Sequence, residues 1–344
     1  MIESLKNEIF IRKNEFKKEK IKSIYFGGGT PSILGANEIN DLIEKVYENY
    51  FVEDSVEITL EANPDDLTKE KIVELSNSKV NRLSIGVQSF FQEDLILMNR
   101  SHTSGQAIEC IKYATQYFKN ISVDLIYGIP GLDNFRWKEN INILLTYKIM
   151  HISAYALTVE PNTALEKYIK KGIISNVDDL QSQEQFYILL DILEANNYEN
   201  YELSNFAKNK LYSVNNFAYW TRKKYLGIGP SAHSFNGNFR FWNIKNNVKY
   251  IESINKNILP NKKEELTKID KFNEIVMFGL RTNLGVSFLK IESEFGTSYK
   301  NKLIKNSQSH IKHDFLSIKN NFLYITRKGK FLSDGIASDL FILN

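Results

Sequence analysis

Short apolar runs alternate with amphipathic stretches along the first half of the chain. Five runs have the length and composition of buried strands, and they cover residues 24–26, 55–62, 82–88, 120–127 and 151–158. Apolar residues recur every three or four positions between them, which predicts helices over residues 2–20, 36–50, 67–76, 104–118 and 135–146, with a shorter one from Gln92. A repeated strand-then-helix order connects parallel strands, so the sequence predicts an α/β fold.

The pattern changes after about residue 180. A helix is predicted over 182–195 and a short strand over 198–203, followed by aromatic and glycine-rich stretches at 215–220 and 225–235. The C-terminal part predicts three helices, a hairpin and a final helix, over residues 268–282, 286–295, 299–311, 315–318, 322–325 and from Lys330. This set is typical of a small α+β domain of winged-helix type. We therefore divide the chain into a barrel region, a linker region and a C-terminal domain, at residues 1–205, 206–260 and 261–344.

Polar residues and glycines gather where the predicted strands end. Residues 27–30 follow the first strand, Glu61 and Gln88 end the next two, Asp124 lies near the end of the fourth, and Thr158 ends the fifth. The carboxyl ends of the strands form one rim in an α/β barrel and line the crevice of an open parallel sheet, and ligand sites are built at both. Each residue alone is as well explained by a helix cap or a loop contact. Their recurrence on successive strands predicts a shared pocket.

Three consecutive glycines end the first strand, and Thr30 and Pro31 follow them. Glycines let the backbone turn sharply and leave N–H groups free to contact a ligand, and proline suits the first position of a helix. The spacing lacks both the lysine of a P-loop and the third glycine of the dinucleotide fingerprint, which argues against phosphate and NAD. A plain strand-to-helix turn is the alternative. Three glycines before Thr-Pro favour a ligand-binding loop.

Charge and cysteine content narrow the function classes. Lys and Arg total 44 and Asp and Glu 41, and this net charge of +3 gives no support for nucleic acid as a partner. The winged-helix part also lacks a basic recognition helix. The chain shows neither a signal peptide nor an apolar run of membrane-spanning length, so we expect a cytoplasmic protein with no membrane span. Cys110 is the only cysteine, so no disulfide and no all-cysteine metal site are expected. His310 and His313 lie three apart on a predicted helix, which permits metal binding, but no third ligand is near, so we expect a solvated face and no metal-ligating residue.

Several motifs, in their order along the chain, resemble those of the radical SAM proteins related to oxygen-independent coproporphyrinogen III oxidase. They are Tyr-Phe-Gly-Gly-Gly-Thr-Pro at 25–31, Glu-Ala-Asn-Pro at 61–64, Gly-Val-Gln-Ser-Phe at 86–90, Asn-Arg at 99–100, Val-Asp-Leu-Ile-Tyr-Gly-Ile-Pro at 123–130 and Tyr-Leu-Gly-Ile-Gly at 225–229. Within this group the sequence is most similar to the HemW-type haem chaperones, over nearly its whole length. The resemblance implies a partial radical SAM (β/α) barrel that binds S-adenosylmethionine (SAM) at its strand ends.

The resemblance also implies a role for each rim residue. The residues that would contact the methionine part of SAM, mainly its amino group, are Gly27, Gly28, Gly29 and Thr30. Glu61 would hold the ribose hydroxyls, because two acceptor oxygens suit a diol. Arg100 would pair with the SAM carboxylate as a planar bidentate donor, and Gln88 and Asp124 would complete the polar wall.

One departure from the family concerns its iron–sulfur cluster. Family members begin with a strand and three cysteines spaced Cys-x-x-x-Cys-x-x-Cys, which hold a [4Fe–4S] cluster. The sequence here starts after that point, so we expect that it begins at an internal methionine and that the barrel lacks its first strand. Cys110 lies in a predicted helix and cannot replace three thiolates. Without the cluster no electron reaches SAM, so no radical chemistry and no catalytic residue are expected.

A second departure concerns haem. HemW-type chains carry His-Asn-x-x-Tyr-Trp, whereas residues 215–220 read Asn-Asn-Phe-Ala-Tyr-Trp, so Asn215 replaces the histidine. An amide is a poor ligand for haem iron. Tyr219 and Trp220 of the motif are retained, and His233 lies close enough in sequence to substitute. A packed or surface histidine is the alternative interpretation of His233.

Three functions follow from the resemblance. The first is an N-terminally truncated HemW-type chaperone that binds SAM and haem and delivers haem to a client protein. The second is an oxygen-independent coproporphyrinogen III oxidase of porphyrin biosynthesis, which the Asn-Asn-Phe-Ala-Tyr-Trp stretch at 215–220 argues against. The third is a non-catalytic SAM-binding remnant without a cluster. The sequence leaves both a monomer and a homodimer open.

Overall fold

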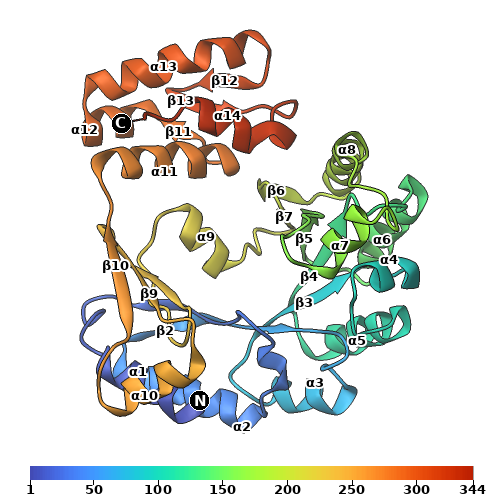
Figure 1. The fold of residues 1–344 in the computed structure, drawn as a ribbon, viewed down its shortest axis with the longest axis vertical. Coiled ribbons are helices and arrows are strands. Elements are labelled where there is room, and N and C mark those ends of the chain that lie inside the picture. Colours follow the sequence, from blue (N-terminus) through green and yellow to red (C-terminus); the bar gives the residue numbers. More distant parts are fainter. Residues whose placement is uncertain (344) are drawn as a thin grey trace.

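A seven-stranded sheet organises the first two-thirds of the molecule in the computed structural model, which describes residues 1–343 (Figure 1). The strand order is β1-β2-β3-β4-β5-β7-β6. The first five strands are parallel and are β1 (Ile21–Phe26), β2 (Val52–Ala62), β3 (Arg82–Gln88), β4 (Asn120–Tyr127) and β5 (His151–Ala156). The antiparallel strands β7 (Asn205–Ala207) and β6 (Glu199–Glu202) extend it beyond β5. The sheet curls into a half-barrel, which confirms the predicted α/β class.

Helices cover the outer face of this sheet (Figure 1). They are α2 (Ala36–Asn49), α3 (Lys69–Ser76), α4 (Gln92–Leu97), α5 (Ser104–Tyr117), α6 (Asn134–Thr146) and α8 (Asp179–Ala195). The side chain of Thr103 accepts a hydrogen bond from a backbone N–H in the first turn of α5, and Asp133 does the same for α6, so both starts are capped. The core between helices and sheet is apolar, with Leu60, Leu83 and Val123 fully buried.

The inner face of the sheet is polar, because successive side chains of a strand point to opposite faces. Glu61, Ser84, Ser122 and His151 are register neighbours on β2 to β5, and they alternate with the apolar residues of the outer face. Ser122 Oγ lies 2.7 Å from His151 Nδ1, and His151 Nε2 lies 2.8 Å from the hydroxyl of Tyr201. This buried row links the middle of the half-barrel to β6.

The predicted first helix is too long. Helix α1 spans only Ile2–Ile11, and residues 12–19 form turns before β1. Between Ile11 and Ile21, Phe16 is the only apolar residue. A helix over this stretch would have no apolar face to bury, and packing of such a face supplies most helical stability. The chain turns instead and buries Phe16 alone.

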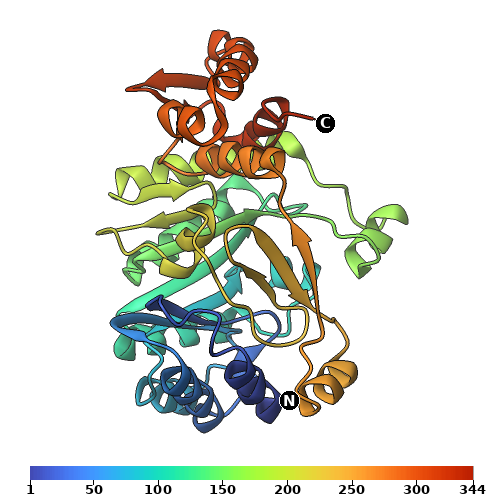
Figure 2. The same cartoon turned by 90° about the vertical axis from the view of Figure 1, so that its left-hand side faces the viewer.

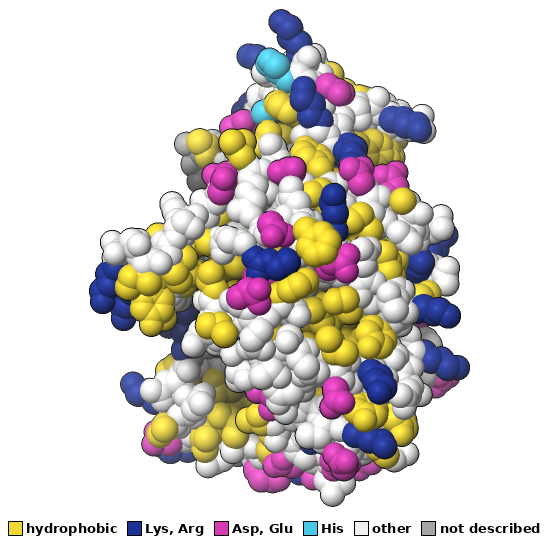
Figure 3. Space-filling view, turned by 90° about the vertical axis from the view of Figure 1, so that its right-hand side faces the viewer, with side chains coloured by type: hydrophobic (Ala, Val, Ile, Leu, Met, Phe, Trp, Pro, Cys, Tyr) yellow, Lys and Arg dark blue, Asp and Glu magenta, His cyan; other side chains and the backbone are white. Residues whose placement is uncertain are grey.

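A second, three-stranded antiparallel sheet follows the half-barrel, with the order β10-β9-β8. It comprises β8 (His233–Phe235), β9 (Phe239–Asn243) and β10 (Asn261–Glu265). Along the chain, α9 (Val214–Trp220) precedes β8, and α10 (Asn247–Asn255) lies between β9 and β10. Between β5 and α8, the segment that carries α7 (Ala164–Lys170) projects from the body of the molecule (Figures 2 and 3). None of the seven residues of α7 is buried.

The C-terminal domain has its own core, which is separate from the core of the half-barrel. Its elements are α11 (Lys268–Arg281), β11 (Val286–Ser287), α12 (Phe288–Phe295), α13 (Thr297–Lys312), β12 (Leu316–Lys319), β13 (Phe322–Ile325) and α14 (Ser333–Asp339). A helix was predicted over residues 286–295. The observed helix α12 starts two residues later, at Phe288, because Val286 and Ser287 pair with β13. The predicted hairpin is present, and Asn320 and Asn321 turn it with positive φ angles of 51° and 64°.

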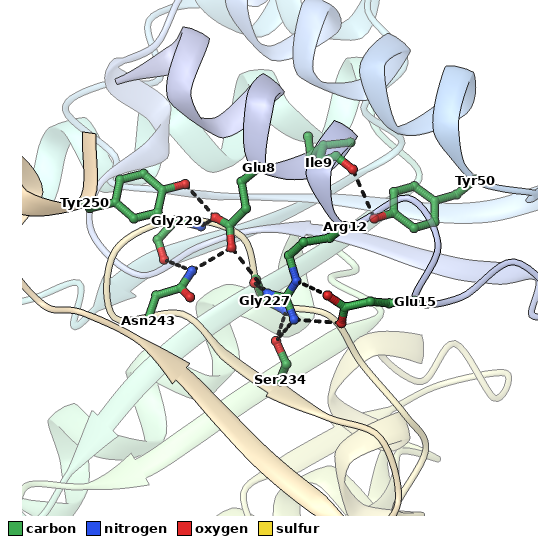
Figure 4. A network of polar contacts seen from close by, with 10 residues as sticks. All are labelled: Glu8, Ile9, Arg12, Glu15, Tyr50, Gly227, Gly229, Ser234, Asn243 and Tyr250. Carbon is green, nitrogen blue, oxygen red and sulfur yellow. Dashed lines mark hydrogen bonds and ion pairs between the residues drawn. The ribbon is translucent and has the colours of Figure 1, made fainter. Parts of the chain in front are cut away.

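Buried polar contacts fix α1 to the three-stranded sheet and α10 (Figure 4). The carboxylate of Glu8 is fully buried and accepts hydrogen bonds from Asn243 Nδ2 at 2.7 Å and from the hydroxyl of Tyr250 at 2.5 Å. It also accepts the backbone N–H of Gly229 at 2.7 Å. Arg12, one turn later, donates to the carbonyl oxygen of Gly227 at 2.9 Å. We call these side chains and their partners the Glu8 network.

Within residues 1–343, every helix is too short or too polar to cross a lipid bilayer.

Candidate functional site

The glycine loop after β1 leaves little room on one side and open space on the other. A Cβ atom on Gly27 would lie 2.6 Å from the ring of Tyr25 and 2.8 Å from the carboxyl carbon of Glu61. Gly28 and Gly29 have φ angles of +78° and +143°, which L side chains rarely adopt, and no atom lies near their Cβ positions. The loop therefore needs glycine for contact at its first position and for backbone conformation at the next two.

Glu61, at the end of β2, is oriented by this loop. One carboxylate oxygen accepts the hydroxyl hydrogen of Tyr25 at 2.6 Å, and the other accepts the backbone N–H of Gly28 at 3.2 Å. The carboxylate keeps further acceptor positions, because each of its oxygens has two lone pairs. Burial of Tyr25 and its bond to Glu61 raise the pKa of the tyrosine far above its usual value, so the phenol remains a donor.

A polar pocket of about 210 Å³ lies at the carboxyl ends of β2, β3 and β4. Six of the eight residues assigned by position to SAM line it, namely Gly29, Thr30, Glu61, Gln88, Arg100 and Asp124. Gly27 and Gly28 lie on the far side of the loop and border a neighbouring cavity. Asn63, Ser84 and Gly86 also line the pocket and were not predicted. Ser84 and Gly86 could have been predicted from the sequence, because they precede Gln88 at two-residue spacing and so lie on the same face of the strand.

The backbone at Gln88 is held in an unusual conformation. Its φ angle is +67°, and the pairing of β3 with β4 shifts register between Ile85 and Gln88. Such left-handed backbone in a residue other than glycine costs about 1–3 kcal/mol and is concentrated at functional sites. Arg100 reaches the same place, where its Nη2 donates to Asn63 Oδ1 at 2.8 Å and lies 3.4 Å from the carbonyl oxygen of Gly86.

Asp124, on β4, is the second acid that lines the pocket. Burial raises its pKa to about 6, although a hydrogen bond from Ser153 and the nearby charge of Arg82 oppose this rise. The group is therefore mostly ionised at pH 7 and mostly protonated at pH 5. Ionised, it is an acceptor only; protonated, it can also donate. The pocket thus holds two carboxylates, on β2 and β4 with β3 between them, together with the guanidinium of Arg100.

A second cavity, of about 1,390 Å³, runs beside β1 and α9. Asn215, Tyr219 and His233 all line it. Asn215 is fixed by its backbone N–H, which donates to Glu57 Oε1 at 3.2 Å, and the ring of Tyr219 meets that of Tyr225 edge-on at 4.7 Å. His233 is exposed on β8, with its ring stacked 6.2 Å from that of Trp242.

Trp220 does not lie in this cavity. Its ring meets Phe278 of α11 at 5.5 Å, and the guanidinium of Arg281 lies 5.0 Å from the ring centre. Trp220 and Tyr219 are adjacent in sequence, and a helix turns successive side chains by about 100°. The two aromatic residues of the predicted haem motif are therefore separated, and Trp220 joins α9 to the C-terminal domain.

A [4Fe–4S] cluster, which the family resemblance implies, does not fit the residues present. Cys110 is buried in α5, and burial raises its thiol pKa to about 12, so it is a poor thiolate donor. Residues 1–343 bring no three His, Cys, Asp or Glu side chains together in an arrangement that could hold a metal ion.

Two known families match parts of this chain. The radical SAM superfamily matches residues 4–143, which include the glycine loop and the pocket residues up to Asp124. The HemN C-terminal domain matches residues 266–332, which contain α11 to β13.

Two curated relatives cover most of this chain, and both are named heme chaperone HemW. The protein from Lactococcus lactis is 32% identical over 336 residues, which are 97% of this chain and 87% of the relative. The protein from Bacillus subtilis is 32% identical over 321 residues, with 92% and 84% covered. Among solved structures, coproporphyrinogen III oxidase (HemN) from Escherichia coli has a TM-score of 0.83 at 22% identity and covers 98% of this chain and 82% of its own. At that identity the likeness shows a shared fold alone.

Proposed function

Because this chain belongs to the HemW family of radical SAM proteins, we propose that it binds SAM and haem and delivers haem to a client protein. SAM would bind in the polar pocket at the ends of β2 to β4, which we call the rim pocket, and haem would bind in the larger cavity beside β1 and α9. The observation that carries the proposal is the convergence of Glu61, Arg100 and Asp124 on one pocket beside a glycine loop. These groups come from separate segments of the chain, and a helix-cap or loop-contact role would not require them to meet.

The proposed SAM site assigns complementary groups to each part of the ligand. Thr30 and the backbone of the glycine loop face the methionine amino group, and the guanidinium of Arg100 faces the carboxylate. Glu61 accepts the ribose hydroxyls, since the loop already orients its oxygens. Asp124 in its ionised form supplies a further acceptor. The residues present bind and orient SAM, and without a fitting cluster we propose ligand binding rather than cleavage.

The haem part of the proposal rests on the larger cavity. Tyr219 supplies an aromatic wall, and His233 offers the imidazole that Asn215 cannot supply. Aromatic rings beside an open cavity suit a flat, largely apolar ligand. We do not propose coproporphyrinogen oxidation, because the similarity to the oxidase extends to the fold alone.

Isothermal titration tests the SAM site. Wild-type protein is expected to bind SAM, and Glu61→Gln is expected to weaken binding by roughly tenfold, because the amide keeps one acceptor oxygen and loses the charge. Glu70→Gln, on the exposed first turn of α3, serves as the control and should bind as wild type does.

Haem delivery needs a separate measurement. Haemin titration followed by mixing with an apo-haem protein, read from the Soret band, is expected to show binding and then transfer. If the protein binds SAM but not haemin, the proposed chaperone function is wrong. A folded chain that binds neither ligand would be the non-catalytic remnant.

A further inference from the structure

The cavity beside β1 carries a strong excess of positive charge. The cationic side chains on its lining are Lys18, Lys20, Lys22, Lys210, Lys223, Lys224 and Arg222, whereas Glu19 is the single acid on the lining. A cleft lined by one sign of charge concentrates ligands of the opposite sign. The molecule as a whole is nearly balanced at +3, so this excess is local.

Much of this charge is free of protein partners. Lys224 pairs with Glu19 at 2.6 Å, and Arg222 pairs with Glu274 at 3.2 Å. Lys18, Lys22, Lys210 and Lys223 have no carboxylate within ion-pair distance among residues 1–343. Lysines of this kind hold an anion as flexible point charges.

The same cavity has an apolar and aromatic body. Phe16, Ile24 and Phe26 lie on its β1 side, and Phe217 and Tyr225 lie on the side of α9. Its volume of about 1,390 Å³ exceeds the roughly 300–1,000 Å³ of common small-ligand sites. A matching ligand is therefore large and mostly apolar, and it carries more than one negative charge at its edge.

Groups that ligate iron well are few on this lining. Tyrosine can ligate haem iron, but burial raises the pKa of four lining tyrosines, so these phenols keep their protons: Tyr25, Tyr50, Tyr212 and Tyr225. His233 is the one imidazole among the residues that border the cavity, and it is exposed and stacked on Trp242. Asn215 stands where an axial histidine would be expected, and its side-chain oxygen lies 3.3 Å from the hydroxyl of Ser23. Charge and shape dominate this surface, and metal ligation does not.

We propose that the cavity recognises tetrapyrroles by their carboxylates and flat ring rather than by their iron, so that iron-free porphyrins bind about as well as haem. This inference rests on the proposed haem function and deepens it by naming the ligand class. The carboxylates pair with the unpartnered lysines at the two ends of α9 and on β1, and the ring lies along the aromatic wall. The site is thus a dicarboxylic tetrapyrrole site with little dependence on the central metal.

Three probes separate these contributions: haemin, protoporphyrin IX and protoporphyrin IX dimethyl ester. Quenching of protein fluorescence is expected to give dissociation constants for haemin and protoporphyrin within about threefold of each other, and a constant for the ester about tenfold weaker. Raising the salt concentration should weaken the binding of haemin and protoporphyrin and leave the binding of the ester unchanged, because salt screens exposed charges.

Charge reversal locates the contact. Lys22→Glu combined with Lys223→Glu should weaken the binding of haemin and protoporphyrin by roughly tenfold or more and leave the binding of the ester unaffected. Lys302→Glu with Lys305→Glu, on exposed positions of α13, is the matched control and should bind as wild type does. Equal thermal midpoints for both double variants show that both remain folded.

Each outcome decides between the two proposals. Haemin binding without protoporphyrin binding, or an ester that binds as tightly as the acids, overturns recognition by carboxylates and leaves the haem function standing. The same holds if charge reversal at Lys22 and Lys223 has no effect. If folded wild-type protein binds neither haemin nor protoporphyrin, the haem function itself fails.

Discussion

At the residue scale, the rim pocket depends on close packing between the glycine loop and Glu61. Gly27→Ala would place a methyl group within 2.8 Å of the carboxyl carbon of Glu61, so the acid or Tyr25 must move. Calorimetry should show SAM binding weakened by roughly tenfold, and overpacking should lower the free energy of unfolding by about 1–3 kcal/mol. Gly35→Ala is the control, because its nearest neighbour would lie at an ordinary 3.7 Å. Unchanged SAM affinity in Gly27→Ala would contradict the assigned site.

Asp124 gives the pocket a pH response. Its pKa of about 6 lies above the usual 3.8, so the carboxyl gains its proton as pH falls through 6 in the folded protein. If the ionised form accepts hydrogen bonds from SAM, affinity should fall about tenfold between pH 7 and pH 5. Asp124→Asn should flatten this profile in titrations at several pH values. A profile that keeps its slope in the variant would assign it to another group.

The same group affects stability with the opposite sign. Because the folded state holds the proton more tightly than the unfolded chain does, protonation of Asp124 adds stability as pH falls from 6 toward 3.8. Denaturant titrations should therefore give Asp124→Asn a higher free energy of unfolding than wild type at pH 7. This advantage should disappear near pH 4. No change in the difference between the two proteins would contradict the raised pKa.

At the element scale, two adjacent residues of α9 have different roles. Trp220 packs against α11, whereas Tyr219 is 41% exposed in the cavity. Trp220→Ala should lower the free energy of unfolding by about 1–3 kcal/mol, and Tyr219→Ala should mainly weaken haemin binding. Chemical denaturation and haemin titration of both variants measure the two effects. Equal losses of haemin affinity with no stability difference would show that Trp220 contacts ligand.

Elements with strong local patterns were predictable from the sequence, and those fixed by distant partners were not. The strands β3 and β4 were predicted at their observed bounds, since each is an apolar run between turn residues. The antiparallel β7 gave no signal, because Asn205–Ala207 is too short to show alternation and owes its pairing to β5. The same cause explains β11, which takes Val286 and Ser287 from a predicted helix.

At the scale of the whole molecule, the Glu8 network joins the first helix to residues far along the chain. Glu8→Ala would leave Arg12 as a buried charge without this partner and remove the acceptor for Asn243 and Tyr250. Breaking a buried, hydrogen-bonded charge pair typically costs about 3–5 kcal/mol, which thermal and denaturant unfolding should detect. Glu3→Ala, which removes an exposed acid of α1, should change stability little. Equal effects from the two variants would argue against the network.

The candidate site was predictable in part for the same reasons. Glu61, Gln88 and Asp124 could be grouped because parallel strands bring their carboxyl ends together, whereas Arg100 was assigned only through the family resemblance. The structure places all four around one pocket. The large cavity could not be predicted, since it forms where β1, α9 and the loop before β8 meet. Its lysines are spread between Lys18 and Lys224, and no local pattern connects them.

The Glu8 network also bears on the order in which this protein is made. The hydroxyl of Tyr250 stands 242 positions after Glu8, so the buried carboxylate emerges from the ribosome long before its partner. At about 5–20 residues per second, the delay is roughly 12–50 seconds. During that interval Arg12, one turn further along the chain, can neutralise the Glu8 carboxylate, but the hydrogen bonds from Gly229, Asn243 and Tyr250 are still missing. The face of α1 that carries Glu8 can therefore be covered only late in synthesis, and a nascent chain that ends before Tyr250 should leave this face accessible to chaperones and proteases.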